Sequence, residues 1–156
     1  MLKVAYTHRL DTNDLADLRG VASCAHQLQH WIDKTHEARV VIVGNRMFAV
    51  TIHAGSPRSR VDWRTDFDAL RYELVQMPVE VERGLSQYME TFGLVYAACD
   101  FCIDRDGRWL FLESNSSGQY AWLEAATGAP ISAALADLLA KGEVDARLAG
   151  SGRVSR

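Results

Sequence analysis

Two acidic residues and an amide have the types and spacing of a site for a hard metal ion. Asp100 lies within an apolar run, and Glu113 and Asn115 follow the turn signal Asp106-Gly107. If these two turn residues form a tight hairpin loop, counting back along both strands places Asp100 directly opposite Glu113. Asn115 then lies on the same face, because alternate residues of a strand share a face. The sequence therefore predicts two carboxylates and an amide together on one hairpin.

Two carboxylates at this separation need a compensating partner. Their Cβ atoms would be about 5 Å apart, where like charges destabilise a sheet. A shared proton, a neighbouring Arg or a divalent cation could each compensate. The donors are all oxygen atoms, which suits Mg²⁺ or Mn²⁺ better than Zn²⁺. Since Mg²⁺ usually completes its shell with waters and substrate phosphates, a nucleotide is the natural further ligand.

The alternative is that Asp100 and Glu113 are ordinary solvated residues on an exposed face. The strand around Asp100 is too apolar to favour that interpretation, since Tyr96, Ala98 and Cys102 surround it. The same register predicts an opposite, apolar face, made of Phe101, Ile103, Leu110 and Leu112. Cys99 and Cys102 are three apart, so a strand would place them on opposite faces as buried thiols and not as a metal or redox pair.

Other segments predict the elements that would position this hairpin. An earlier hairpin is expected from Val40–Val43 and Met47–Ile52 around Gly44-Asn45. A helix is expected between Pro78 and Gly93, and two more over Tyr120–Ala126 and from Ile131 to about Ala140. In the N-terminal stretch, weaker patterns suggest strands over Leu2–Thr7 and Ala25–Ile32, with a polar, turn-like stretch over Asp11–Leu18. The class is α+β, with a mainly antiparallel sheet, hairpins and packed helices.

Composition excludes several classes of protein. The 156 residues suit one domain, which we place at residues 1–148, with residues 149–156 as a flexible tail. The net charge of −3 argues against a nucleic-acid partner. Apolar runs are far shorter than the ~20 residues of a membrane span, and three cysteines cannot form a disulfide framework. We therefore expect a cytoplasmic protein with no membrane partner.

The hairpin residues also carry a family resemblance. The stretch from Asp100 to Gln119, and above all Phe111-Leu112-Glu113-Ser114-Asn115, resembles the metal-binding end of ATP-grasp ligases. It is most similar to the ATP-grasp maturases of ribosomally made peptides, the graspetide synthetases. Earlier stretches agree in order, namely Gln29-His30-Trp31-Ile32, Glu37-Ala38-Arg39-Val40, Val43 to Ala49, and Asp62-Trp63-Arg64-Thr65-Asp66 with Ala69 to Glu73. The resemblance runs from about Tyr6 to Leu139 and implies the C-terminal half of an ATP-grasp domain.

The resemblance implies a role for each matching residue. The adenine of ATP would contact the Gln29 side chain and the backbone of His30, Trp31 and Ile32. Glu37 would hold the ribose hydroxyls. Arg39 would lie near the phosphates or an acyl phosphate, and Arg64 would stabilise the reacting acyl group. Asp100, Glu113 and Asn115 would bind Mg²⁺ or Mn²⁺.

The implied activity is ATP-dependent ligation. In the family, ATP phosphorylates a carboxylate of a ribosomally made precursor peptide, and an amine or hydroxyl then displaces phosphate to give an amide or ester cross-link. The sequence contains no glycine-rich phosphate loop, and Lys3 and Lys34 do not lie in such a context. Two readings therefore stay open: a ligase that works with a missing N-terminal half or a homodimer partner, or a non-catalytic remnant that binds nucleotide and metal or precursor peptide only.

Overall fold

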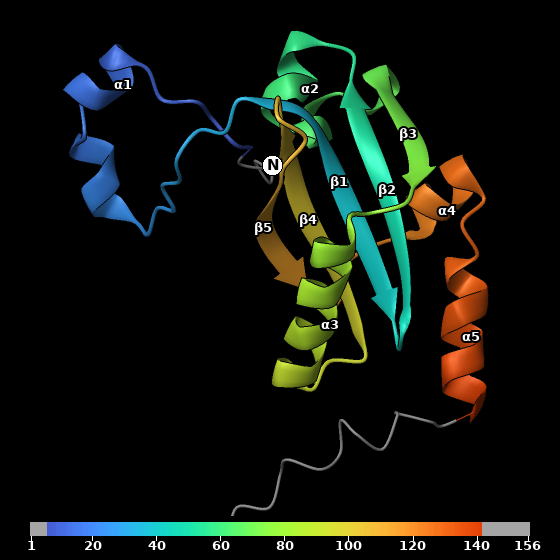
Figure 1. Ribbon diagram of the computed structural model, residues 1–156. Coiled ribbons are helices and arrows are strands. Elements are labelled where there is room, and N and C mark those ends of the chain that lie inside the picture. The colour runs from blue at the N-terminus through green and yellow to red at the C-terminus, as the bar shows by residue number, and fades with distance from the viewer. Residues whose placement is uncertain (1–5, 142–156) are drawn as a thin grey trace, which may run out of the picture.

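The chain folds around a five-stranded antiparallel sheet with helices on both faces. The structure is a computed structural model that describes residues 6–141 (Figure 1). The predicted tail at 149–156, and most of the predicted strand Leu2–Thr7, lie outside the described residues. In chain order the elements are α1 (Thr12–Ala16), η1 (Arg19–Ser23), β1 (Lys34–Val43), β2 (Arg46–Ala54), α2 (Pro57–Val61), η2 (Trp63–Thr65), η3 (Phe67–Ala69), β3 (Leu70–Val75), α3 (Val79–Phe92), β4 (Tyr96–Asp104), β5 (Trp109–Asn115), α4 (Ala121–Thr127) and α5 (Ile131–Lys141).

The sheet has the order β3-β2-β1-β4-β5, so β1 lies at its centre. The first predicted hairpin is confirmed. Val43 pairs with Arg46 across the two loop residues, and Gly44 adopts the positive φ of +60° that a tight turn needs. Strand β1 then pairs with β4 on its other side, which places residues from three segments of the sequence in common rows across the sheet.

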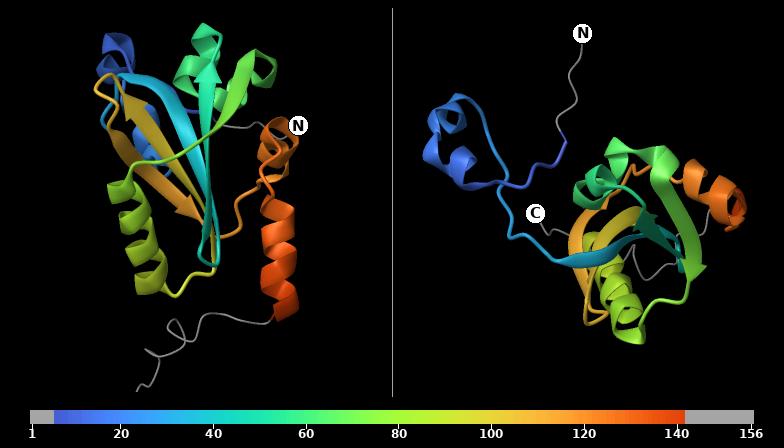
Figure 2. Two further views of the ribbon diagram at one scale, coloured as in Figure 1. Left: turned by 45° about the vertical axis from the view of Figure 1, so that its right-hand side comes forward. Right: turned by 90° about the horizontal axis from the view of Figure 1, so that it is seen from above.

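The three predicted helices are confirmed, and each has a physical start or stop. Helix α3 follows Pro78 and ends at Gly93, whose φ of +62° lets its N–H reach the carbonyls of Glu90 and Met89. Helix α4 ends in the same way at Gly128. Figure 2 shows α3 and α5 on opposite sides of the sheet.

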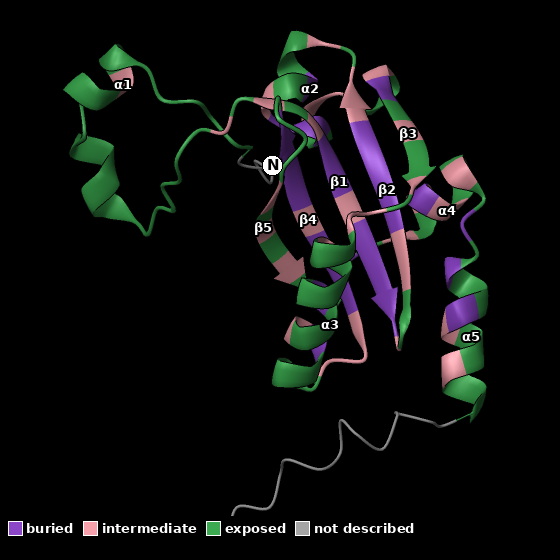
Figure 3. Ribbon diagram, in the orientation of Figure 1, coloured by how far each residue is buried: buried purple, intermediate pink, exposed green. Residues whose placement is uncertain are grey.

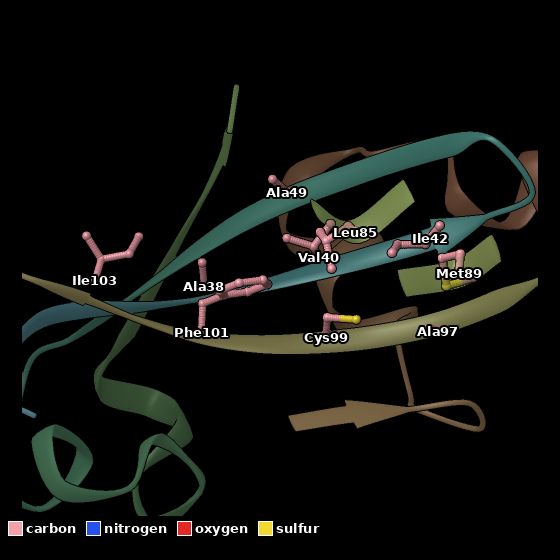
Figure 4. Packing of buried hydrophobic residues seen from close by; sticks show 10 residues of the cluster. All are labelled: Ala38, Val40, Ile42, Ala49, Leu85, Met89, Ala97, Cys99, Phe101 and Ile103. Carbon is pink, nitrogen blue, oxygen red and sulfur yellow. The ribbon is translucent and has the colours of Figure 1, made fainter. Parts of the chain in front are cut away.

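The core consists of apolar layers on the two faces of the sheet. Under α3, a buried cluster joins alternate residues of the central strands to the helix, as Figure 4 shows: Ala38, Val40, Ile42, Ala49, Leu85, Met89, Ala97, Cys99, Phe101 and Ile103. On the other face, Val41, Val43 and Val50 pack against α4 and α5 through Leu123 and Ile131. Burial is concentrated in the central strands, as Figure 3 shows.

The N-terminal segment corrects two of the sequence-based expectations. Ala25–Ile32 is not a strand, since β1 begins only at Lys34. The polar stretch after Leu10 contains the short helix α1, because the Asp11 side chain caps it by accepting hydrogen bonds from the N–H groups of Asn13 and Asp14. This segment extends away from the sheet, and most of its residues are exposed (Figure 1). Without a neighbouring strand, its apolar residues have no ladder to join.

Candidate active site

Three charged residues form a single row across the middle of the sheet. Arg39 on β1 pairs in register with Asp100 on β4, and Asp100 pairs with Glu113 on β5. The predicted opposition of Asp100 and Glu113 is therefore confirmed. Asn115 pairs with Ala98, one step along the same face. This row lies on the face of the sheet that also carries α4 and α5.

The register arises differently from the prediction. The loop has three residues between Asp104 and Arg108, with Gly107 at φ +76°, in place of the two residues expected. This shifts the pairing by one residue, and an irregularity between Asp100 and Phe101 shifts it back. As a result Phe111, and neither Leu110 nor Leu112, pairs with Phe101, so the predicted apolar face was wrong on β5. The ring centroids of Phe101 and Phe111 lie 5.6 Å apart.

Arg39 supplies the compensation that the carboxylate pair requires. Its Nε and Nη2 donate to the two oxygens of Asp100, both at 2.7 Å. Only 12% of the Arg39 side chain and 14% of the Asp100 side chain are exposed. Burial works against the charged guanidinium, yet the hydrogen bonds and negative charge of Asp100 raise the pKa of Arg39. The neighbouring Arg is thus the partner that this structure provides.

Arg39 is also held from the sides by groups that sequence reasoning did not assign to the site. Its Nη1 donates to the carbonyl of Gln119 at 3.2 Å. The guanidinium carbon lies 5.4 Å from the Trp63 ring centroid and 5.8 Å from that of Trp122. Such distances are typical of cation–π contacts. The only available signal was that Trp63 stands beside Arg64 in the stretch that carries the family resemblance.

Glu37 lies two residues before Arg39 on the same face and is 9% exposed. Burial raises the pKa of its carboxyl, the adjacent Lys34 ammonium opposes that rise, and the charges of Asp100 and Asp62 add to it. Lys34 donates to Glu37 and to the carbonyl of Val61. No role was predicted for Lys34, although it precedes Glu37 by three residues in the sequence.

Arg64 lies in η2 and is fixed by Asp62. The Arg64 Nε and Nη2 donate to the Asp62 carboxylate at 2.9 and 2.8 Å, and the Arg64 backbone N–H adds a third bond at 3.1 Å. Thr7 donates a fourth from its N–H at 3.0 Å. Burial alone would raise the pKa of Asp62, but these hydrogen bonds and the Arg64 charge lower it to about 2.

Arg64 faces the row of charged residues. Hydrogen bonding to Asp62 raises the pKa of Arg64, burial opposes this, and the charges of Glu113 and Asp100 raise it further. Half of the Arg64 side chain remains exposed, at 51%. The described structure therefore brings Glu37, Arg39, Arg64, Asp100 and Glu113 together at one face.

The four residues proposed for adenine differ from these charged residues in exposure and in local structure. Gln29 and His30 are exposed and belong to no helix or strand. Trp31 is 38% exposed, with Arg9 at 5.0 Å and Lys34 at 5.9 Å from its ring. Ile32 is half-buried and accepts from the Lys34 N–H just before β1 begins. The adenine role of these residues stays a prediction.

The donor set fits a hard cation in its chemistry. Within residues 6–141, no group of three or more His, Cys, Asp and Glu side chains is arranged to hold a metal ion. The predicted ligands comprise only two carboxylates, Asp100 and Glu113, with the exposed Asn115 amide beside them. Asn115 Oδ1 already accepts from the N–H of Ser117 at 2.8 Å. Two carboxylates and an amide leave room for phosphate oxygens and waters, as Mg²⁺ prefers.

The two thiols near the row are structural. Cys99 and Cys102 are buried on opposite faces of β4, as the sequence predicted. Burial raises the pKa of both thiols, which keeps them protonated and unreactive.

Comparison with known proteins adds a family to this geometry. No protein-family model matches the sequence, and no curated protein matches it either. Among solved structures, the macrocyclase MdnC bound with precursor peptide MdnA from Microcystis aeruginosa MRC is 32% identical with a TM-score of 0.77. A RiPP-associated ATP-grasp ligase of Chryseobacterium gregarium, in complex with ADP and a leader and core peptide, is 26% identical with a TM-score of 0.81.

In fold and in sequence, this chain is similar to part of the ATP-grasp ligases, among them proteins solved with a precursor peptide or with a leader and core peptide. The ATP-grasp ligase PsnB, solved with a phosphomimetic variant of minimal precursor, Mg and ADP, has the same fold at 22% identity and a TM-score of 0.72. Each of these three matches covers 90% of this chain and 44% of the other chain. The chain thus spans less than half the length of the solved structures, and its five-stranded α+β fold is part of the ATP-grasp fold.

In the described residues, no helix has both the length and the apolar character needed to cross a membrane.

Proposed function

We propose that this chain contributes the metal and phosphate side of an ATP-dependent carboxylate ligase that cross-links a ribosomally made precursor peptide. The supporting observation is the row Arg39–Asp100–Glu113, with Glu37 and Arg64 on the same face. Two solved relatives that are at least 26% identical were captured with precursor or leader and core peptides, and one of them with ADP. The carboxylates and the arginine of the row can bind a metal ion and phosphate groups, which fits the ADP bound in one of these relatives.

The residues would divide the work by charge. When bound, ATP with Mg²⁺ would supply the phosphoryl group and neutralise its oxygens. Asp100, Glu113 and Asn115 would hold the ion, and the buried Glu37 would accept hydrogen bonds from the ribose hydroxyls. Arg39 would stabilise charge on the transferring phosphoryl group.

Arg64 would act on the peptide. Its fork is fixed by Asp62, and its exposed side would orient the substrate carboxylate as this attacks the γ-phosphorus and ADP leaves. An amine or hydroxyl of the peptide would then attack the acyl phosphate, expel phosphate and form the amide or ester. Arg suits both steps, because its planar fork matches carboxylate and phosphate oxygens.

The test is the Glu113→Gln variant, with Glu90→Gln on the exposed side of α3 as a matched control. Chain, ATP, Mg²⁺ and a peptide with acidic and Lys, Ser or Thr residues are incubated, and mass spectrometry follows loss of one water from the peptide with equimolar ADP. We expect Glu113→Gln to abolish cross-linking while ADP affinity changes by less than about threefold, because the adenine and ribose contacts remain. Near-normal ligation by Glu113→Gln would overturn the assigned role.

A second function is favoured by one observation, the exposure of Glu113 and Asn115 at the open end of the charged row. In that case the chain binds nucleotide and metal, or precursor peptide, without turnover. Calorimetry separates the two: binding of Mg-ADP or peptide by wild type without cross-linking supports the binding function, and cross-linking supports the ligase. A chain that binds neither ligand contradicts both.

A further inference from the structure

The guanidinium of Arg39 binds the Asp100 carboxylate, which a metal ion at this site would need as a ligand. Both oxygens of Asp100 accept from Arg39 at 2.7 Å, in the forked geometry that makes the strongest Arg–carboxylate pairs. An ionised carboxylate has about four lone-pair positions, and this fork takes one on each oxygen. A divalent ion at Asp100 would therefore lie next to a fixed positive charge.

The position of Arg39 is fixed from three segments at once. Trp63 lies in η2, Trp122 lies in α4, and the Gln119 carbonyl belongs to the segment that follows β5. A side chain with this many contacts has lost its rotamer freedom already, and it does not leave Asp100 without a replacement partner.

The other charged groups of this face are paired differently. Asp62 is paired with Arg64, and Glu37 is paired with Lys34. Among the described residues, Glu113 has no ion-pair partner and is exposed. The face thus has one open carboxylate, Glu113, next to one that is closed by an internal cation, Asp100.

We propose that Arg39 is an internal counter-cation that closes Asp100 to free divalent ions. When a nucleotide binds, Arg39 moves from Asp100 to the phosphates of the nucleotide, and Asp100 becomes available to the metal ion. This inference rests on the proposed function. Phosphate oxygens offer Arg39 the replacement acceptors that a bare metal ion cannot. Nucleotide and metal consequently bind together, and the ion alone binds weakly. Removing Arg39 then has opposite effects on the two ligands, with tighter binding of the bare ion and weaker binding of the nucleotide.

The first experiment measures binding of Mn²⁺ alone, by electron paramagnetic resonance, to wild type and Arg39→Met. We expect Arg39→Met to bind Mn²⁺ at least about tenfold more tightly, because the opposing charge next to Asp100 is gone. Arg46→Met is the matched control. It loses the same charge from an exposed pair with Asp137, and its Mn²⁺ affinity stays within about twofold of wild type.

The outcome that overturns the proposal is a folded Arg39→Met chain that binds Mn²⁺ no more tightly than wild type does. Circular dichroism and a cooperative melt establish folding. In Arg39→Met/Asp100→Asn both charges of the pair are absent, and the tighter Mn²⁺ binding must disappear; its persistence would show that another site binds the ion and would also overturn the proposal.

A second measurement is made on the wild-type chain, so that no buried charge has to be removed. The Nε–H signal of Arg39 is followed by ¹⁵N nuclear magnetic resonance in wild type and assigned with Arg39→Lys. We expect Mg²⁺ alone to leave the signal in place, and Mg²⁺ with a non-hydrolysable ATP analogue to shift it. An unmoved signal at a concentration of this complex that saturates the chain by calorimetry overturns the movement of Arg39 from Asp100 to the phosphates. If wild type binds no such complex, the proposed function fails, while the Mn²⁺ comparison still decides whether Arg39 closes Asp100.

Discussion

At the scale of residues, Arg39 offsets the repulsion between Asp100 and Glu113 by donating to both oxygens of Asp100. Two carboxylates placed opposite each other on a hairpin need a proton, an Arg or a cation, and nothing in local spacing chooses among these. The choice depends on β1 lying next to β4, which brings Arg39 within reach of Asp100 across 61 residues of sequence. Long-range pairing of this kind has no local signature, so Arg39 could be assigned to the site only by resemblance.

Asp62 illustrates the same limit. Its motif neighbours were noted in the sequence, yet its role as the buried acceptor for Arg64 and for the Thr7 N–H follows from tertiary contacts. The hydrogen bonds to the ionised carboxylate make it a titrating contributor to stability.

We predict that Asp62→Asn removes a pH-dependent part of the free energy of unfolding. The pKa of Asp62 is about 2 in the folded chain, and about 3.9 is expected when the chain is unfolded. A lowered folded pKa stabilises the protein above the unfolded value, and this stabilisation is lost as pH falls from about 4 towards 2. Urea unfolding should therefore show wild type about 1 to 2 kcal/mol more stable than Asp62→Asn at pH 6, with the gap reduced to roughly a third of that by pH 2.5.

Asp137→Asn is the control for this titration, since Asp137 pairs with Arg46 at an exposed site. Its stability should stay close to that of wild type throughout. Parallel curves for wild type and Asp62→Asn between pH 6 and pH 2.5 would contradict the assignment.

At the scale of elements, strong local signals were reliable and weak ones were not. The helix between Pro78 and Gly93 and the turn at Gly44 were predicted because proline and glycine restrict or extend the backbone in known ways. The strand Ala25–Ile32 failed, because an apolar run becomes a strand only when another strand pairs with it. In the second hairpin, a longer loop and a bulge each shifted the pairing by one residue and cancelled at Asp100.

The segment after β5 depends on a glycine that packs against the sheet. A Cβ added to Gly118 would lie 2.4 Å from the Cβ of Ala98 and 3.3 Å from the carbonyl oxygen of Asn115. The Gly118 carbonyl also accepts a hydrogen bond from the Tyr96 hydroxyl at 2.5 Å. Close approach of the backbone therefore positions both Asn115 and the Gln119 carbonyl that holds Arg39.

We predict that Gly118→Ala destabilises the chain by about 1 to 3 kcal/mol, because Ala98 is buried and cannot move aside. The control is Gly84→Ala in α3, where an added Cβ meets nothing within 4 Å. Alanine there should stabilise the helix by up to about 1 kcal/mol. Urea midpoints that shift in the same direction for both variants would contradict the close-packing role of Gly118.

At the scale of the whole molecule, the sequence motifs indicated a resemblance to ATP-grasp ligases, although no family model and no curated protein matches this sequence. The solved structures supply that match through the fold, over 90% of this chain. The residues proposed for the metal and the phosphates could be named from the sequence because hard-metal and phosphate chemistry restricts residue types. How much of the binding site the chain contains could not be judged from motifs, since it depends on which groups surround the ligand.

Within the described residues, the groups proposed for the nucleotide and its metal lie on a single face. Glu37, Arg39, Asp100 and Glu113 lie on one face of the sheet, and Glu113 and Asn115 are exposed. Small-molecule sites usually bury about 70–90% of the ligand, and a single face buries far less. Lys34, one of the three lysines in the sequence, is already paired with Glu37, so its charge is compensated within the chain.

We therefore predict that the isolated chain binds Mg-ADP with a dissociation constant in the high micromolar range or weaker, since each tenfold in affinity needs about 1.4 kcal/mol of further contact. Isothermal titration calorimetry on the 156-residue chain measures this directly. Glu37→Gln should weaken binding further, because it removes the charge of the carboxylate proposed for the ribose hydroxyls, while Glu90→Gln on α3 should leave it unchanged. Nanomolar binding by the isolated chain would contradict a one-sided site, because the described face would then have to supply the whole of the binding free energy.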